Sequence, residues 1–508
     1  MKINQIKAGA ILSYVIIAVN NIVGLLYTPF MLRMMGQNEY GLYSLASSIV
    51  AYLTVLDLGF NNAIIRYTAK YRAEGKIEEQ YKMFGMFFSL YCIISLIVIF
   101  AGMILYCNIE GLFGNSMTSD DISKVKVMVV MLIANLAFTF PMSLWGGIIT
   151  AYEDFVFQKI ITLARVILNP LAMIFMLILG YRAIGMVFVI TLFNIASLSI
   201  NAIYCFKKLH IRLRVGRFQW GFLKEVSVYS FWIFLSAIVD RLYWGSGQFI
   251  LGIFRSTVEI AVYAVAIQMQ SFYTSFSYAI SSLLLPKTVK LVTNKEPVNV
   301  ISDFFIKISR IQFYPIGLIL FGFIVFGKKF IIYWAGSEYE LAYYMSTAFM
   351  VPQLFTTMQQ TGYTVLQAQN RVKFRALSIL LSSVLAILIS IPISKYYGGI
   401  GVSMCIAFGL FFGNLLILNI YYYKVVKLNM KEFWKETLKL SVWPVVFSTG
   451  YYFLMLQFPS SSLLCFILNI VAYATIYITG CVLFSFNEYE KQTILKPVRM
   501  YIKKFLRR

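Results

Sequence analysis

The sequence predicts an all-α, polytopic membrane protein with fourteen transmembrane helices, arranged as two pseudo-symmetric six-helix bundles followed by two C-terminal helices. Three observations lead to this fold class. Of the 508 residues, 60% are hydrophobic and only 13% are charged. Lysine and arginine alternate between dense and sparse along successive connections. Short segments of the first half recur in the same order in the second half.

The composition excludes an ordinary soluble protein. Soluble domains are about 45–50% apolar and cover each core with polar residues. A chain of 508 residues would form several such domains in water, and this one has too few polar residues to cover them. A lipid bilayer resolves the problem, because a helix satisfies its own backbone hydrogen bonds and can expose apolar side chains to lipid.

Fourteen apolar segments have about the 20 residues that a spanning helix needs. Turn-forming and charged residues separate them, such as Gly36, the pair Gly398 and Gly399, and Pro459. We expect the first segment to be a retained helix, since it is longer than the core of a signal peptide. The predicted spans are 8–30, 41–65, 83–106, 125–148, 160–180, 184–206, 227–252, 259–285, 303–326, 341–364, 376–394, 400–423, 439–457 and 461–484.

The basic residues set the orientation. With the N-terminus inside, inner connections and tails hold 33 lysines and arginines, against eight in outer connections. Cytoplasmic loops are enriched in these residues, so we expect both termini to be cytoplasmic. One missed span would scramble the alternation, which supports the count of fourteen. The same bias, together with contact with anionic membrane lipids, explains the net charge of +23. A role in binding nucleic acid is not expected, because the sequence contains no soluble basic domain.

An internal repeat divides the chain. Residues 39–46 (EYGLYSLA) recur as residues 259–266 (EIAVYAVA), and residues 184–186 match residues 400–402. Six helices in each half give both halves the same orientation, related by an axis along the membrane normal. We expect the substrate between the two bundles. The predicted domains are 1–206 (N-terminal bundle), 207–226 (basic cytoplasmic linker), 227–423 (C-terminal bundle), 424–484 (two appended helices) and 485–508 (basic cytoplasmic tail).

Two stretches of sequence resemble a known family. Residues 36–43 (GQNEYGLY), followed by residues 56–60 (LDLGF) and Arg66, are similar to the N-terminal signature of the Wzx-type polysaccharide flippases. Asp240, followed by residues 262–263 (VY), is similar to the matching signature of their second half. The fourteen spans and the repeat extend this resemblance along the whole chain.

The resemblance implies a fold and a function. The family belongs to the multidrug/oligosaccharidyl-lipid/polysaccharide exporter superfamily, whose members have a V-shaped, MATE-like pair of bundles. The implied substrate is undecaprenyl-pyrophosphate bearing an oligosaccharide repeat unit, translocated across the bacterial plasma membrane for surface polysaccharides such as O-antigen, capsule or exopolysaccharide. Further expected partners are membrane lipids and a polysaccharide polymerase with its chain-length machinery. The protein is then a transporter and not an enzyme.

Polar residues inside the predicted spans are the candidates for substrate binding, because a charge at the centre of a membrane helix costs about 2.5–3.5 kcal/mol. Arginine suits a pyrophosphate, since its planar fork donates two hydrogen bonds. The candidate substrate-binding residues are Arg241, Arg165, Arg310, Arg66, Asn20, Asn21, Asn61 and Gln268. Other roles remain open: Arg66 as an interfacial anchor, Arg165 and Arg310 reaching the membrane surface, and Gln268 in inter-helix hydrogen bonds.

Two aspartates are candidates for ion coupling. Asp240 lies beside Arg241 near the middle of the seventh predicted span. Asp57 lies deep in the second predicted span and is four residues before Asn61, a spacing that puts both on one helix face. The alternative for each aspartate is a structural pair with an arginine on another helix.

No cofactor or metal is expected, and the coupling ion would be H⁺ or Na⁺. The single histidine, His210, lies in a basic loop, and the six cysteines form no C-x-x-C pair. The sequence has no P-loop to bind ATP. Two alternative functions remain at this point. One is a cation-coupled exporter of small molecules or drugs. The other is a membrane-embedded polysaccharide polymerase or ligase, which the short outer loops disfavour.

Overall fold

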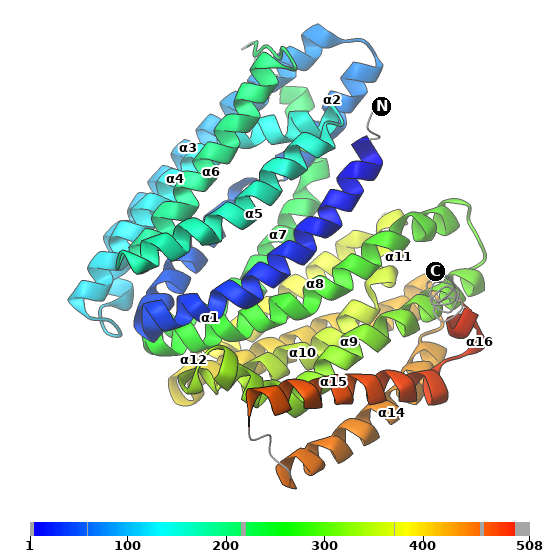
Figure 1. The fold of residues 1–508 in the computed structure, drawn as a ribbon. Helices are drawn as coiled ribbons and strands as arrows, with labels where there is room; N and C mark the ends of the chain where they lie inside the picture. Colours follow the sequence, from blue (N-terminus) through cyan, green and yellow to red (C-terminus); the bar gives the residue numbers. More distant parts are fainter. Residues whose placement is uncertain (1–4, 58, 215–219, 370, 458–461, 493–508) are drawn as a thin grey trace, which may run out of the picture. The chain divides into compact units, whose positions relative to one another are not determined.

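The structure, a computed structural model, describes residues 5–57, 59–214, 220–369, 371–457 and 462–492. Within these ranges the chain is helical between short turns and contains no strand (Figure 1). Many of the helices exceed the 20 residues that cross a bilayer. The all-α fold class predicted from the sequence is therefore confirmed.

The first two predicted spans form one helical run with two breaks. Helix α1 (Gln5–Leu53) passes through Gly36, whose φ of 75° and ψ of 167° are not helical. Glycine tolerates this conformation because it lacks a Cβ atom. The run then tightens into the 3₁₀ turn η1 (Thr54–Asp57), and helix α2 (Phe60–Ala73) begins after Gly59, which also has a positive φ of 71°.

Four separate helices complete the first half. Thr118 caps the N-terminus of α4, because its hydroxyl accepts from the amide of Asp121 while the Asp121 carboxylate accepts from the amide of Thr118. This cap stands where the sequence predicts a break. The four helices are α3 (Ile77–Phe113), α4 (Ser119–Ala151), α5 (Phe155–Ile178) and α6 (Ala183–Lys207).

The second half has the same kind of irregularity. Helix α12 passes through Gly398, whose φ of 54° and ψ of −142° break it at the predicted place. Three short π-helical turns, η3, η4 and η5, widen the later spans. The elements are α7 (Trp220–Phe254), α8 (Thr257–Thr293), α9 (Val298–Trp334), η2 (Ser337–Tyr339), α10 (Ala342–Met358), α11 (Gln360–Ala368), α12 (Val372–Leu410), η3 (Phe411–Ile417), α13 (Leu418–Tyr421), η4 (Tyr422–Val426), α14 (Met430–Gln457), α15 (Leu463–Gly480), η5 (Cys481–Ser485) and α16 (Glu488–Glu490).

The chain forms two compact units, Met1–Val265 with Ser383–Ile406, and Ala266–Ser382 with Ala407–Arg508. In the first unit α3 packs along α4, α4 along α6 and α1 along α5 (Figure 1). In the second unit α9 packs against α10, α14 and α15. The bundles predicted at 1–206 and 227–423 were defined by the repeat and not by compactness, and they stay a prediction.

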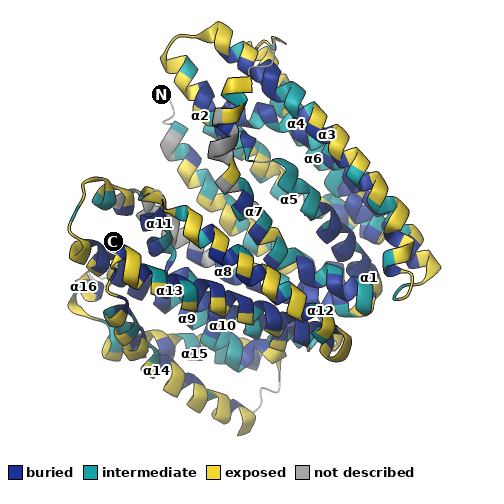
Figure 2. Cartoon of the chain, turned by 180° about the vertical axis from the view of Figure 1, so that it is seen from behind, coloured by how far each residue is buried: buried dark blue, intermediate teal, exposed yellow. Residues whose placement is uncertain are grey.

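Apolar side chains cover the surfaces of the long helices. On α3, Leu96 is 67% exposed and Phe100 is 69% exposed, in a row of exposed residues that Figure 2 shows along this helix. Exposed apolar areas of this extent are costly in water and favourable in lipid. Within the described residues, eight helical runs are long and apolar enough to cross a membrane: Ala8–Ala73, Ile77–Phe113, Ser119–Ala151, Phe155–Ile178, Ala183–Lys207, Val298–Trp334, Val372–Val426 and Leu463–Ser485.

Apart from short interruptions, the predicted spans coincide with helical structure in the part of the chain that the structure describes. Two of the eight long runs each contain two predicted spans, joined through Gly36 and through Gly398. The exact number of fourteen crossings stays a prediction. The expected break at Pro459 and most of the expected basic tail lie outside the described residues.

The structure corrects two spans that the sequence suggests are continuous. The second predicted span (41–65) is interrupted by η1 and Gly59, and the tenth (341–364) is interrupted between α10 and α11. Polar residues mark both breaks, Asp57 with Asn61 and Gln359 with Gln360, but a segment of about 20 residues around each still contains enough apolar residues to suggest a continuous span. Interrupted membrane helices commonly bind ligands or ions, since their backbone groups lack intrahelical partners at the break.

Candidate functional site

Asp57 lies at the interruption of the second predicted span, on the last residue of η1. Its carboxylate accepts a hydrogen bond of 3.0 Å from the hydroxyl of Tyr91 on α3, and Tyr91 is completely buried. The argument that Asp57 and Asn61 share one helix face is wrong, because the left-handed Gly59 separates η1 from α2. A carboxylate at a helix break is still a suitable ion site, so ion coupling by Asp57 stays a prediction.

Asn61 and Arg66 lie on α2, which follows this break in the chain. The side-chain oxygen of Asn61 is buried against Gly147 of α4 and has no hydrogen-bond partner among the described residues. Arg66 is exposed, with its guanidinium carbon 5.7 Å from the centre of the Tyr67 ring. Substrate binding by either residue stays a prediction.

Arg165 projects from α5 at one end of a polar chain that crosses the first unit. It donates a hydrogen bond of 3.2 Å to the amide oxygen of Asn194 on α6. Asn194 in turn donates to Asn135 and Thr139 on α4, at 2.8 and 2.7 Å. No described carboxylate lies within ion-pairing distance of Arg165, whose side chain is exposed. The chain of amides orients this guanidinium without neutralising its charge.

The other candidates lie on α1, α7 and α8. Asp240 and Arg241 are both exposed on α7, and no described carboxylate forms an ion pair with Arg241. On α1, Asn20 is exposed, while Asn21 donates to the carbonyl of Ile17 at 3.0 Å. This last contact is an ordinary bond within one helix. Gln268, on α8, is half-buried in the second unit.

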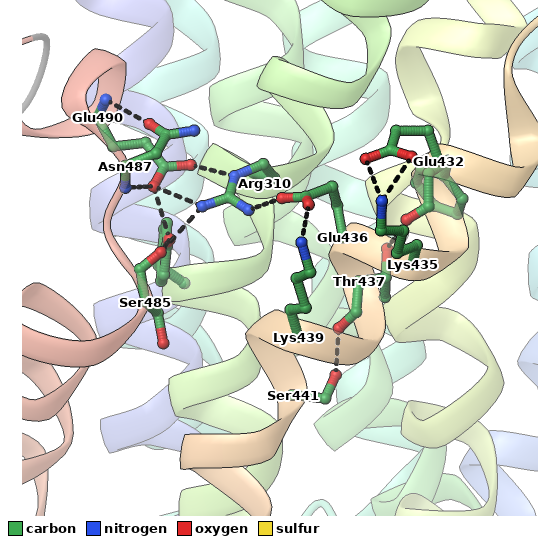
Figure 3. A network of polar contacts seen from close by, with 12 residues as sticks. Arg310, Glu432, Lys435, Glu436, Thr437, Lys439, Ser441, Ser485, Asn487 and Glu490 are labelled. Atoms are coloured by element: carbon green, nitrogen blue, oxygen red, sulfur yellow. Dashed lines mark hydrogen bonds and ion pairs between the residues drawn. The ribbon is translucent and has the colours of Figure 1, made fainter.

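Arg310 has a different environment, buried in the second unit with only 6% of its surface exposed (Figure 3). Its Nε and Nη2 atoms donate to the two carboxylate oxygens of Glu490 at 2.6 and 3.0 Å. Its Nη1 atom donates to Glu436 on α14, and Nη2 also donates to the carbonyl of Ser485. Arg310 thus offers no free fork to a pyrophosphate in this arrangement.

The carboxylates around Arg310 form a buried ionic network. Glu490 is completely buried and accepts further bonds from the hydroxyl of Tyr314 at 2.8 Å and the amide of Asn487 at 2.9 Å. Burial acts to raise the pKa of the Glu436 carboxyl, but hydrogen bonds and charges from Lys439 and Arg310 lower it below its usual value. The network joins α9, α14 and α16, so substrate binding by Arg310 stays a prediction that its partners disfavour.

Two buried or half-buried glutamates of the repeat, which are not among the candidate residues, accept hydrogen bonds at the beginnings of later helical segments. Glu39 accepts a hydrogen bond of 3.2 Å from the amide of Ala183, the first residue of α6, and one of 2.8 Å from Lys124. Glu259 accepts one of 3.0 Å from the amide of Gly399, where α12 resumes after its break. Glu39 and Glu259 are 220 residues apart, and both begin the repeated octapeptide.

These two contacts are equivalent in the repeat. Ala183 precedes residues 184–186 and Gly399 precedes residues 400–402, the pair of segments that also match. A carboxylate at a helix N-terminus satisfies free amides and complements the helix dipole. The structure therefore confirms the internal repeat at the level of single hydrogen bonds. The glutamate that both copies of the octapeptide share was the sequence signal for these two contacts.

Comparisons with known proteins now bear on identity. A family model of polysaccharide biosynthesis proteins matches residues 6–292, more than half of the chain. The chain belongs to this family. A Shigella flexneri protein described as an O-antigen transporter is 20% identical over 357 residues, which cover 68% of this chain and 81% of that protein.

Solved structures show the same fold. The lipid II flippase MurJ, in an inward closed conformation, aligns with a TM-score of 0.69 and 16% identity over 94% of this chain and 99% of its own. An inward-facing multidrug resistance MATE family transporter of the MOP superfamily aligns with a TM-score of 0.64 and 13% identity over 82% of this chain and 95% of its own. These findings confirm a multi-pass membrane protein with a transporter fold, and its relatives are transporters and flippases, not enzymes.

Proposed function

We propose that this protein is a flippase that carries undecaprenyl-pyrophosphate-linked oligosaccharide repeat units from the cytoplasmic to the outer leaflet of a bacterial plasma membrane. Membership of the polysaccharide biosynthesis family supports a role in making a surface polymer. The likeness to a protein described as an O-antigen transporter supports transport of a lipid-linked sugar unit. The likeness to a lipid II flippase supports a fold that suits such a substrate.

One observation carries the proposal beyond family membership. Arg165 lies within a helix that is long and apolar enough to cross a membrane, and Arg241 lies on α7, which contains the seventh predicted span; neither forms an ion pair with a described carboxylate. An arginine without a counter-charge is costly in a membrane unless water or an anionic ligand accompanies it. A pyrophosphate supplies that counter-charge for part of a transport cycle, and the arginine fork matches its oxygens. Arg310, by contrast, already has two carboxylate partners.

The same arginines weigh against the alternative of a drug exporter. The MATE-like fold is compatible with export of small molecules. Exposed guanidinium groups repel cationic drugs, however, and attract anionic headgroups. We therefore keep the lipid-linked sugar as the substrate.

Ion coupling completes the proposed mechanism of alternating access. Asp240 adjoins Arg241 in the sequence, and Asp57 lies at the interruption of a membrane helix. Binding of an anionic substrate to the arginines would weaken their influence on nearby carboxylates and so raise the pKa of those carboxylates, which would link substrate binding to ion binding. H⁺ or Na⁺ is the proposed ion, both termini are proposed to be cytoplasmic, and a polysaccharide polymerase would use the product outside.

Deletion of the gene tests the proposal. We expect undecaprenyl-linked oligosaccharide to accumulate on the cytoplasmic leaflet and one surface polysaccharide to disappear. The measurement is mass spectrometry of extracted lipid-linked intermediates, together with staining of the surface polymer. Restoration by the wild-type gene is the control. Normal polymer without accumulated intermediate would contradict the proposal, and loss of drug resistance alone would favour the exporter.

A further inference from the structure

Helix α5 is polar along one face and apolar along the opposite face, although it is long and apolar enough to cross a membrane. At about 100° per residue, side chains spaced by four, three and four positions share one face of a helix. This spacing relates four polar residues, Gln158, Thr162, Arg165 and Asn169. On almost the opposite side lie four exposed apolar residues, Ile160, Ile167, Leu171 and Ile178. The apolar face suits lipid, and the polar face, on which Arg165 is exposed, suits water or a polar ligand.

Arg165 keeps one edge of its guanidinium group free of protein partners on this polar face. Its Nη1 atom donates a hydrogen bond of 3.2 Å to Oδ1 of Asn194 on α6, and no described atom accepts from Nε or Nη2. A guanidinium group holds a phosphate with two parallel hydrogen bonds from neighbouring nitrogen atoms. Because Nη1 is engaged, Nε and Nη2 form the edge that can hold such a ligand.

The amide of Asn194 has one orientation, because each of its polar atoms has a fixed partner. The guanidinium group of Arg165 contains only donors, so the Asn194 atom that faces it is the oxygen. The Asn194 nitrogen donates to Oδ1 of Asn135 at 2.8 Å and to Oγ1 of Thr139 at 2.7 Å. The Thr139 hydroxyl donates its own hydrogen to the carbonyl of Asn135 at 2.7 Å, which leaves its oxygen to accept. The hydrogen bonds therefore run in one direction, from Arg165 on α5 through Asn194 on α6 to α4.

We propose that Asn194 is a positioning residue for an anion site at Arg165, where one phosphoryl group binds to Nε and Nη2. Asn194 supplies an acceptor without a charge, so it fixes the guanidinium plane and leaves the positive charge to the ligand. A carboxylate at the same position would hold the same nitrogen atom but would also neutralise it. The identity of the ligand rests on the proposed function, whereas the positioning by Asn194 rests on the contacts alone.

Binding of inorganic pyrophosphate to the full-length protein in nanodiscs tests the site without requiring transport. Isothermal titration calorimetry at fixed pH and salt measures Kd, and the binding that Arg165→Gln removes is assigned to this site. We expect Asn194→Leu to weaken that Kd about threefold, because the charge stays but the orienting hydrogen bond is lost. We expect Asn194→Asp to weaken it about tenfold, because the introduced carboxylate pairs with Arg165.

A spectroscopic signal distinguishes positioning from a general structural role. With ¹⁵N-labelled arginine, the Nε–H resonance of Arg165 is identified by its absence in Arg165→Gln. Pyrophosphate should shift this resonance in the wild type, because Nε donates to the ligand. In Asn194→Asp the resonance should already be displaced without pyrophosphate and should respond to it only weakly, while the thermal unfolding temperature stays close to that of the wild type.

Matched controls carry similar substitutions away from the polar face of α5. Asn108→Leu removes an exposed amide whose hydrogen bond stays within α3, and Arg182→Gln removes an exposed arginine before α6. Both should keep the wild-type Kd and the wild-type shift of the Arg165 resonance. If Asn194→Leu does not fold, Thr139→Val removes only one of the two acceptors that hold Asn194 and should weaken Kd about twofold.

Three outcomes would overturn the inference. Wild-type Kd values for Asn194→Leu and Asn194→Asp would remove Asn194 from the site. A wild-type Kd for Arg165→Gln, or no binding by the wild type, would remove the anion site itself. Equal weakening in Asn108→Leu would show that the effect is not local. The proposed function fails separately, through a normal surface polymer in the deletion strain, which this binding experiment does not use.

Discussion

Single arginines in the predicted spans have opposite environments, and the difference suggests opposite roles. Arg310 is surrounded by Glu436 and Glu490 and bonds to four acceptor atoms. Arg165 has one amide partner, and Arg241 has no ion pair within the described ranges. A charge without a counter-ion is retained in a membrane only where it has a use, so the unpaired arginines are the better candidates for substrate contact.

Substitution of Arg241 by lysine separates charge from geometry. We expect Arg241→Lys to fold normally and to lower flipping about tenfold, because lysine keeps the positive charge but loses the bidentate fork. The measurement is the rate of surface polymer synthesis at equal protein level. Arg182→Lys, at an exposed arginine before α6, is the control and should have no effect. Wild-type rates for Arg241→Lys would assign Arg241 a structural role.

Asp240→Asn tests the ion at the neighbouring position. The amide has the size of the carboxylate but cannot bind a proton or a cation as a counter-charge. We expect substrate binding to persist and the dependence of transport on the ion gradient to weaken. Collapse of the proton or sodium gradient in turn, with transport measured in vesicles, identifies the ion. Unchanged gradient dependence would remove Asp240 from the coupling mechanism.

At the scale of elements, polar contacts fix the positions of helix ends relative to neighbouring helices, which apolar packing alone specifies weakly. The network around Arg310 fastens α16 and the end of η5 to α9 and α14. The equivalent glutamates Glu39 and Glu259 fasten the repeated octapeptide to the beginning of a later helix. Side chains that face lipid contribute little to the relative position of two packed helices, because lipid tails are as apolar as the helices.

Removal of Arg310 should destabilise the second unit strongly. Arg310→Leu leaves Glu490 buried without its counter-charge, which costs about 3–5 kcal/mol. The double variant Arg310→Leu with Glu490→Gln should recover part of the loss, because no unpaired buried charge remains. The free energy of unfolding in denaturant titrations measures both. Lys435→Leu removes an exposed pair with Glu432 and should change it by less than about 0.5 kcal/mol. Equal losses of unfolding free energy in Arg310→Leu and Lys435→Leu would contradict a special role for the buried network.

The two repeated glutamates should contribute independently. Glu39→Gln and Glu259→Gln each remove a charge from a helix N-terminus, for an expected loss of about 1 kcal/mol in the free energy of unfolding. Their effects should add, because the two contacts share no partner. The surface variant Glu110→Gln, at a glutamate that is 73% exposed, is the control. Strong non-additivity would show that the repeats do not act as separate elements.

At the scale of the whole molecule, topology is the property open to direct test. The bias of 33 inner against eight outer lysines and arginines predicts cytoplasmic termini. Reporter fusions at the C-terminus and in the connection near Gly114 should therefore lie on opposite sides of the membrane. A fusion after Lys207, in the predicted linker, is the control and should match the C-terminus. The same side for Gly114 and the C-terminus would break the predicted alternation.

The sequence by itself determined the fold class, the repeat and the places where long helices bend at Gly36 and Gly398. These properties depend on local composition and periodicity. Apolar segments enter lipid because of their own side chains, and glycine permits a positive φ because it has no Cβ atom. The family resemblance in residues 36–66 also needed no structure, because it lies in short contiguous motifs.

Only the tertiary structure decided which polar residues have partners. Arg310 and Arg165 look alike in sequence, yet one meets Glu490, 180 positions away, and the other meets an amide. The interruptions at Asp57 and Gln359 were likewise not predicted, since polar residues inside a span reveal a helix break only once the packing of the helices is known. The physical reason is that the free energy of a buried charge or amide is set by its neighbours in space, and residues distant in sequence supply them.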